Sequence, residues 1–197
     1  RHCENVTTNC WAHGRTVVMK PPVDDLVEWQ LRTRSLRLPR SGELPLVMGI
    51  VNTTPDSFSD GGLWTQTETA VAHGLSLIEA GADILDIGGE STRPFSEPVD
   101  SQEEWRRVGE VVRILSHETD CPISIDTSKA SVAKNAIDNG AEIINDVTGL
   151  QGDPAMVQIA SETGAGICAM HMQGTPKTMQ LNPAYKSVVE EIYAFLE

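Results

Sequence analysis

The sequence predicts an α/β protein built on a parallel β-sheet. From residue 46 onward, short apolar segments alternate with amphipathic segments of helical period. A Gly-Ala pair ends three of the helical segments and begins the next strand, at 81–82, 140–141 and 164–165. Because parallel neighbours need a crossover connection, such repeated units indicate either an open, doubly wound sheet or a closed (β/α)8 barrel. No Gly-x-Gly-x-x-Gly follows the first strand, which weakens the dinucleotide-binding form of the open sheet.

The N-terminal segment differs from the rest of the chain. Residues 1–40 hold seven Lys or Arg and four Asp or Glu, whereas residues 41–197 hold eight and 24. Residues 1–28 show no clean apolar period and contain the pair Pro21-Pro22, so we expect a disordered extension or linker there. From Trp29 to Leu38 apolar and basic residues partly alternate, which predicts a strand or hairpin.

The elements that follow are expected in strict alternation. Strands are predicted at 46–51, 84–87, 123–125, 143–147 and 166–170. Helices are predicted around 71–78, from Ser101, around 132–137, after the pair Asp153-Pro154, and from Asn182-Pro183 to the end. Ser101 with Glu104 has the spacing of a capping box.

Composition excludes several classes of protein. The chain has 197 residues and a net charge of −13, which argues against binding nucleic acid through a broad basic face. It contains no run of 18 apolar residues, so we expect no membrane span. The four cysteines are scattered and follow no secretion signal, so a cytoplasmic location is expected.

Polar residues gather where the predicted strands end. In a parallel α/β fold these ends share one edge of the sheet, where sites form. Helix caps and loops also use Asn and Asp, so the joint pattern favours a site more than any one residue does. The residues are Asn52, Glu90, Asp126, Asn145, Asp146 and His171.

Two long motifs carry a resemblance to a known family. The stretch Met48-Gly-Ile-Val-Asn-Thr-Thr-Pro-Asp-Ser-Phe-Ser-Asp-Gly-Gly62 resembles the first signature of dihydropteroate synthases. Asp86-Ile-Gly-Gly-Glu-Ser-Thr-Arg-Pro94 resembles the second signature. Shorter matches follow in order at 123–127, 144–147 and 170–176, so the resemblance covers residues 29–197.

The resemblance implies a (β/α)8 barrel of which only the first five or so units are present. Residues 29–197 are therefore expected to form an incomplete pterin-binding barrel domain, truncated and inactive alone. The implied reaction joins 6-hydroxymethyl-7,8-dihydropterin diphosphate to p-aminobenzoate, giving 7,8-dihydropteroate and diphosphate in folate synthesis. A full-length form is expected to be a homodimer. Alternatives are a pterin-binding module without synthase activity, of the corrinoid methyltransferase type, or a non-catalytic fragment.

The resemblance also implies roles for individual residues. Asp126 and Asn145 would hold the edge of the pterin ring, and Asn52 would bind Mg²⁺ with the departing diphosphate. Asp126 and Arg93 are the expected catalytic residues. The p-aminobenzoate site would be shaped by residues of two loops, and further substrate contacts are expected; these residues are Phe58, Thr92, Arg93, Pro94, Asp56 and Met170.

Overall fold

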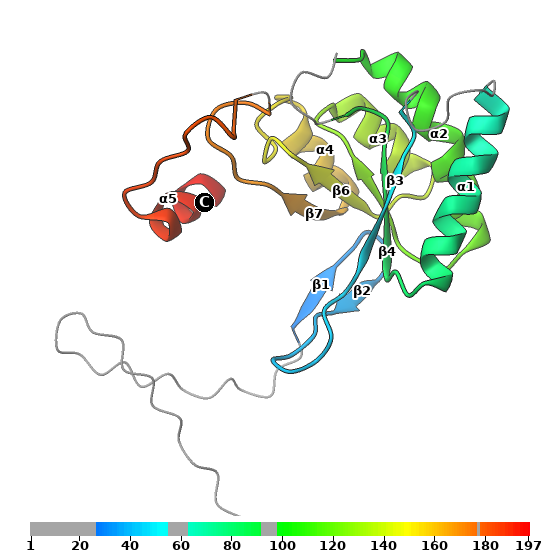
Figure 1. Ribbon diagram of the computed structural model, residues 1–197, viewed down its shortest axis with the longest axis horizontal. Helices are drawn as coiled ribbons and strands as arrows, with labels where there is room; N and C mark the ends of the chain where they lie inside the picture. The colour runs from blue at the N-terminus through cyan, green and yellow to red at the C-terminus, as the bar shows by residue number, and fades with distance from the viewer. Residues whose placement is uncertain (1–26, 55–62, 92–97, 177) are drawn as a thin grey trace, which may run out of the picture.

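Two β-sheets make up the strand structure of the protein. The computed structural model describes residues 27–54, 63–91, 98–176 and 178–197. An antiparallel hairpin pairs β1 (Glu28–Gln30) with β2 (Ser35–Arg37), as the alternating pattern at 29–38 predicts. The larger sheet has five parallel strands in chain order: β3 (Met48–Asn52), β4 (Ile84–Gly88), β5 (Ile123–Asp126), β6 (Ile143–Asp146) and β7 (Gly166–Ala169) (Figure 1).

Four helices form a layer on one face of this sheet. They are α1 (Leu63–Glu79), α2 (Ser101–Glu118), α3 (Ala130–Asp138) and α4 (Met156–Thr163), and each contacts the next. The last helix, α5 (Val188–Leu196), stands apart from this layer (Figure 1). A doubly wound sheet has helices on both faces and a reversal of strand order, so this arrangement is that of part of a (β/α)8 barrel. Within the described ranges, no helix has both the length and the apolar character to cross a membrane.

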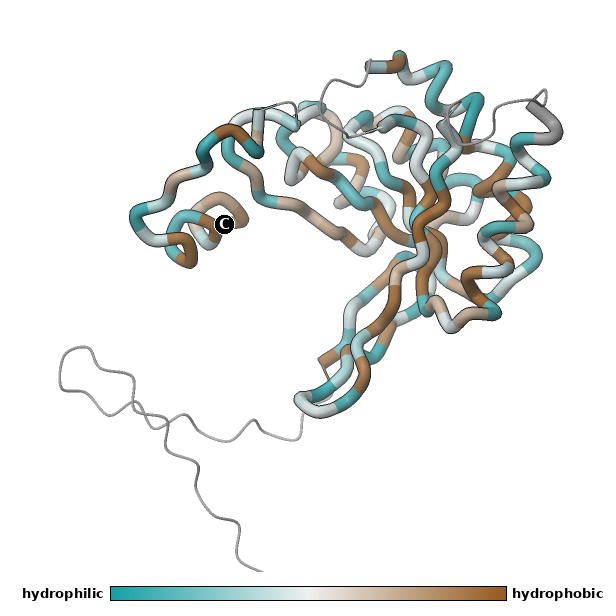
Figure 2. Tube along the Cα trace, viewed as in Figure 1, coloured by the Kyte–Doolittle hydropathy of each residue, from teal (hydrophilic) through white to brown (hydrophobic). Residues whose placement is uncertain are grey.

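Alternation along the strands separates a helix-facing side from an inner side. Val51, Leu85, Ile87, Ile125 and Ile144 are fully buried and belong to one cluster with the apolar sides of the helices. Figure 2 shows this apolar character along the strands and on one side of the helices. Successive side chains of a strand point to opposite faces, so the residues between them face the inside of the barrel.

The hairpin closes the amino ends of the parallel strands. Leu31, in the turn after β1, is buried and forms a second apolar cluster with Ile84 and Ile143. A Cβ atom on Gly166 would lie 2.6 Å from Leu31, so only glycine allows the hairpin to approach this closely. Glu142, just before β6, forms a salt bridge of 2.7 Å with Arg34. Apolar packing and an ion pair between the buried Glu142 and the partly exposed Arg34 therefore hold the hairpin in place.

One predicted helix cap and two predicted helix starts differ from the observed ones, whereas α2 begins at Ser101 as predicted. Asp100, not Ser101, caps α2, since its side chain accepts a hydrogen bond from the Glu103 N–H. The helix predicted after Asp153-Pro154 starts at Met156, and the Asp153 carboxylate accepts both from the Ala155 N–H just before α4 and from the Ala130 N–H at the start of α3. The helix predicted from Asn182 begins only at Val188. Asn, Asp and Ser side chains can all accept from nearby backbone N–H groups, so the sequence alone left the exact start of each helix open.

Candidate functional site

The carboxyl ends of the five parallel strands place one row of residues side by side on the inner face. The strand register aligns Asn52, Gly88, Asp126, Asn145 and Cys168. A Cβ atom on Gly88 would lie 3.5 Å from Oδ2 of Asp126 and 3.7 Å from Oδ1 of Asn52. Both polar side chains therefore flank Gly88, and the missing side chain leaves a polar space between them.

A second row on the same face lies two residues closer to the amino end of each strand. It contains Ile50, Asp86, Ser124, Ile143 and Gly166. The Nδ2–H of Asn145 donates a hydrogen bond of 2.9 Å to Oδ2 of Asp86. These residues belong to β6 and β4, so the bond crosses the intervening strand β5. The two rows are thus joined by an amide and a buried carboxylate.

Among the described residues, carboxylates outnumber cations at this edge of the sheet. Burial, together with the neighbouring charges of Asp86, Glu104, Asp146 and Glu90, raises the pKa of Asp126 to about 7. Burial also raises the pKa of Asp86, although the hydrogen bond from the Asn145 amide opposes this effect. A carboxyl group that titrates near neutrality in a pocket is typical of functional sites. The arrangement can bind N–H donors or stabilise a developing positive charge.

One lysine compensates part of this charge. Lys129 lies between the end of β5 and α3, and its ammonium group pairs with both Glu90 and Glu104. Glu104 is fully buried on α2, whereas Glu90 follows β4. The Glu104 side chain therefore serves this ion pair rather than the capping box that its sequence position suggests.

The structure brings three of the predicted site residues into one row. Asn52, Asp126 and Asn145 stand at the ends of β3, β5 and β6, as expected from the sequence. Met170 follows β7 at the same edge, and its N–H donates to the Asp146 carbonyl. The remaining expected residues lie outside the described residues: Asp56, Phe58, Thr92, Arg93 and Pro94.

Two other strand-end residues have local roles. The Asp146 carboxylate is fully buried and accepts hydrogen bonds from Thr148 and from the Leu150 N–H, so it stabilises a turn. The ring of His171 contacts Phe195 of α5 at 4.8 Å between centroids, in an edge-to-face arrangement. Their presence at strand ends is thus explained by loop structure and by packing.

Asp86 and Cys168 also lie on the inner face of the sheet, although neither was predicted as a site residue. Asp86 lies on the inner face of β4, and the half-buried Cys168 stands opposite Asn145 in the register. Burial raises the pKa of the Cys168 thiol, and the charges of Asp86 and Asp126 raise it further. An aspartate within the apolar run Ile84–Ile87 was the signal for Asp86, because a charged residue in a buried strand is rare without a purpose.

The Asn52 amide oxygen could serve as one oxygen ligand of a Mg²⁺ ion. Mg²⁺ prefers oxygen ligands and is usually held by one or two protein groups together with phosphate oxygens and water. The Asn52 amide oxygen borders the space above Gly88, beside the Asp126 carboxylate. In the described part of the chain no group of three or more His, Cys, Asp or Glu side chains could hold a metal alone. A single amide oxygen would leave the rest of the coordination of such an ion to water or to ligand oxygens.

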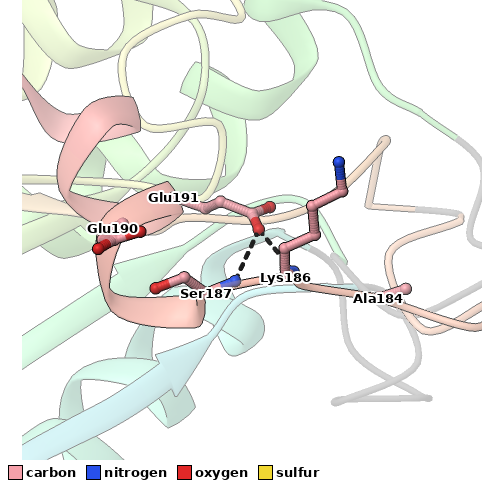
Figure 3. Close-up of a pocket in the computed structure, with 5 residues that line it drawn as sticks. All are labelled: Ala184, Lys186, Ser187, Glu190 and Glu191. Carbon is pink, nitrogen blue, oxygen red and sulfur yellow. Dashed lines mark hydrogen bonds between the residues drawn. The ribbon is translucent and has the colours of Figure 1, made fainter. Parts of the chain in front are cut away.

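A hollow near α5 has a different character. It is lined by Ala184, Lys186, Ser187, Glu190 and Glu191 and is shown in Figure 3. The Glu191 carboxylate accepts hydrogen bonds of 2.8 and 3.1 Å from the backbone N–H groups of Lys186 and Ser187. These contacts tie the two residues just before α5 to the helix. The hollow is thus a by-product of how the helix begins.

Comparison with known proteins points to one family. The profile of the family described as pterin binding enzyme matches residues 48–197. A dihydropteroate synthase of Neisseria meningitidis is 49% identical over 155 residues, which are 78% of this chain and 54% of that protein. The chain therefore spans about half the length of the curated relatives that it matches.

Solved structures agree with these matches. The dihydropteroate synthase of Xanthomonas albilineans with 4-aminobenzoic acid is 45% identical and superposes with a TM-score of 0.75, covering 87% of this chain and 59% of that one. The same enzyme in complex with 7,8-dihydropteroate is 43% identical with a TM-score of 0.70, covering 86% and 57%.

Proposed function

This chain belongs to the pterin-binding enzyme family, and we propose that it carries the pterin-holding part of a dihydropteroate synthase. The reaction would join 6-hydroxymethyl-7,8-dihydropterin diphosphate to p-aminobenzoate and release diphosphate. The observation that carries the proposal is the row formed by Asn52, Asp126 and Asn145 at the carboxyl edge of the sheet. Relatives with 4-aminobenzoic acid and with 7,8-dihydropteroate bound support the same substrates.

The chemistry of the row suits the edge of a pterin ring. That edge presents N–H donors beside acceptors, and a carboxylate next to an amide can satisfy both kinds of group. Asp126 and Asn145 are direct neighbours in the register of β5 and β6. Both are partly buried, so hydrogen bonds formed there exchange less with water. We expect the ring to lie across these two strands.

The proposed bond cleavage uses the negative charge of the site. Loss of diphosphate leaves a cationic pterin methylene, and the Asp126 carboxylate would stabilise that cation as it develops. Asn52 would hold Mg²⁺, which supplies charge neutralisation for the departing diphosphate. The amine of p-aminobenzoate would then attack the methylene carbon, with Arg93, Thr92, Phe58 and Pro94 shaping its site and Asp56 and Met170 contacting substrate. Homodimer formation by a full-length protein and a cytoplasmic location stay predictions.

Pterin binding by the chain tests the proposal directly. Calorimetric titration of the 197-residue chain with 6-hydroxymethylpterin is expected to show saturable binding. We expect Asp126→Asn and Asn145→Ala each to weaken it by about tenfold or more, the cost of one charged or buried hydrogen bond. Asp138→Asn makes the same chemical change on the exposed end of α3 and is expected to leave binding unchanged. Absence of saturable binding, or equal losses in Asp126→Asn and Asp138→Asn, would overturn the assignment.

Diphosphate release separates a synthase from a simple pterin-binding module. Release from 6-hydroxymethyl-7,8-dihydropterin diphosphate that requires p-aminobenzoate and Mg²⁺ identifies the synthase reaction. Pterin binding without such release fits a module that only holds the ring and equally fits the incomplete barrel expected from the sequence, so the absence of release does not by itself identify a module. The same Asp138→Asn control applies to this assay, because its side chain lies away from the strand ends.

A further inference from the structure

We propose that Asp86 is a positioning residue that fixes the side-chain amide of Asn145 in a single orientation. This inference rests on the proposed function only in its choice of pterin as ligand. Asp86 would not contact the ligand. It would act by turning the amide so that the Asn145 carbonyl oxygen, Oδ1, faces the site.

The contact that carries the inference joins two strands that are not neighbours. The Nδ2–H of Asn145 donates to Oδ2 of Asp86 over a distance of 2.9 Å. Asp86 lies on β4 and Asn145 on β6, one row nearer the strand ends, so the bond runs diagonally across β5. Asp86 is only 4% exposed, and its position in the middle of β4 leaves it little freedom to move.

The polarity of the two groups determines the orientation. An ionised carboxylate has no hydrogen to donate, so it can face the N–H side of an amide but not the carbonyl side. With one N–H directed at Asp86, the other N–H and Oδ1 of Asn145 remain for a ligand. An asparagine without such a partner can turn its amide over, and only one of the two orientations matches a given ligand edge. Asp86 therefore selects the donor and acceptor pattern that the site presents.

The surroundings of Asp86 are unfavourable for a carboxylate that would serve only the stability of the fold. Among the described residues, Oδ1 of Asp86 and the hydroxyl of Ser124 have no hydrogen-bond partner of good geometry, although the two residues are opposite each other in the register. Burying a carboxylate without a cation is unfavourable, and an apolar side chain would fill this position at lower cost. Ile143 does so in the same row. The presence of a carboxylate at this position is thus explained by its hydrogen bond to Asn145, which fixes the orientation of that amide.

A double-mutant cycle tests whether Asp86 acts through Asn145. Dissociation constants for 6-hydroxymethylpterin are measured for the full chain carrying Asp86→Ala, Asp86→Asn and Asn145→Ala, alone and combined. We expect Asp86→Ala to weaken binding about tenfold and Asp86→Asn by less, because an asparagine oxygen can still accept from the Asn145 amide. In the Asn145→Ala background both changes are expected to have almost no further effect. Additive losses, or an unchanged dissociation constant in Asp86→Ala, would overturn the inference.

A second measurement needs no ligand and remains informative if the chain binds no pterin. In the ¹H–¹⁵N spectrum, one of the two Nδ2 protons of Asn145 is expected to be protected from exchange. Protection should be lost in Asp86→Ala, be partly kept in Asp86→Asn, and be unchanged in Asp83→Asn, which alters the carboxylate before β4 that accepts from the Val47 N–H. Equal exchange of both protons in the unmodified chain contradicts the positioning role. Failure of pterin binding with protection intact would instead remove the proposed function alone.

Discussion

Buried carboxylates at the two ends of the parallel sheet differ in whether a cation pairs with them. At the amino end, Glu142 is buried but pairs with Arg34 at 2.7 Å and accepts a hydrogen bond of 2.9 Å from the Thr33 hydroxyl. At the carboxyl end, Asp126 forms no salt bridge with any described residue, and burial raises its pKa to about 7. Glu142 and Asp126 are both carboxylates, but only Glu142 has a cationic partner among the described residues.

We infer from this difference that the paired carboxylate stabilises the fold and that the unpaired one serves ligand binding. A compensated carboxylate such as Glu142 fastens the hairpin beneath the sheet, where contacts in barrels of this kind serve stability. An uncompensated carboxylate such as Asp126 stores electrostatic energy that a cationic or N–H-bearing ligand can release. Substitutions at the amino end should therefore lower the unfolding free energy, whereas substitutions at the carboxyl end should change ligand affinity.

The largest expected effect on stability comes from Lys129, the cation that compensates part of the carboxyl end. Lys129→Met leaves the fully buried Glu104 without its cation. Breaking a buried pair in this way costs about 3–5 kcal/mol, measured as the loss of unfolding free energy in urea. Lys134→Met removes an exposed pair with Asp138 and should cost less than about 1 kcal/mol. Similar losses in both variants would contradict the role of Lys129.

Replacing the uncompensated Asp126 should stabilise the fold while it weakens the site. The folded chain keeps the Asp126 proton up to about pH 7, whereas the ordinary value is 3.8. Unfolding therefore releases a proton between these values, and stability falls as the pH rises through this window. Asp126→Asn removes the carboxyl group that causes this decrease in stability. Above pH 7 we therefore expect the unfolding free energy of the variant to exceed that of the unmodified chain by roughly 1–4 kcal/mol.

Denaturation at several pH values checks this expectation. The gain in Asp126→Asn should vanish near pH 4, where both states of the unmodified chain hold the proton. Asp138→Asn should show no comparable pH-dependent gain. A variant that is less stable than the unmodified chain above pH 7 would show that Asp126 is compensated after all.

A smaller loss of stability is expected at the amino end. Arg34→Met leaves Glu142 with hydrogen bonds from Thr33 but without its cation. Because Arg34 is partly exposed and water can replace some of its effect, we expect a loss of about 1–3 kcal/mol in thermal or urea unfolding. Pterin affinity should not change in the folded protein. A drop in affinity without a drop in stability would contradict the division between the two ends.

Much of the fold follows from periodicity in the sequence, but the contacts within the site do not. The order of strands and helices, and the placing of Asn52, Asp126 and Asn145 at strand ends, were predictable because parallel strands end at a common edge. The bond between Asp86 and Asn145 joins residues 59 positions apart and depends on register, which no local pattern encodes. Glu104 was misassigned to a capping box because its ion pair with Lys129 is equally non-local.

Measuring the pKa of the Asp126 carboxyl group by NMR, with and without 6-hydroxymethylpterin, tests the central claim most directly. The claim is that this carboxylate is buried without compensation so that it can hold a ligand. We expect a value of about 7 in the free chain and a lower value when pterin N–H groups stabilise the charged form. A value near 4 in the free chain, or one that pterin does not change, would contradict it.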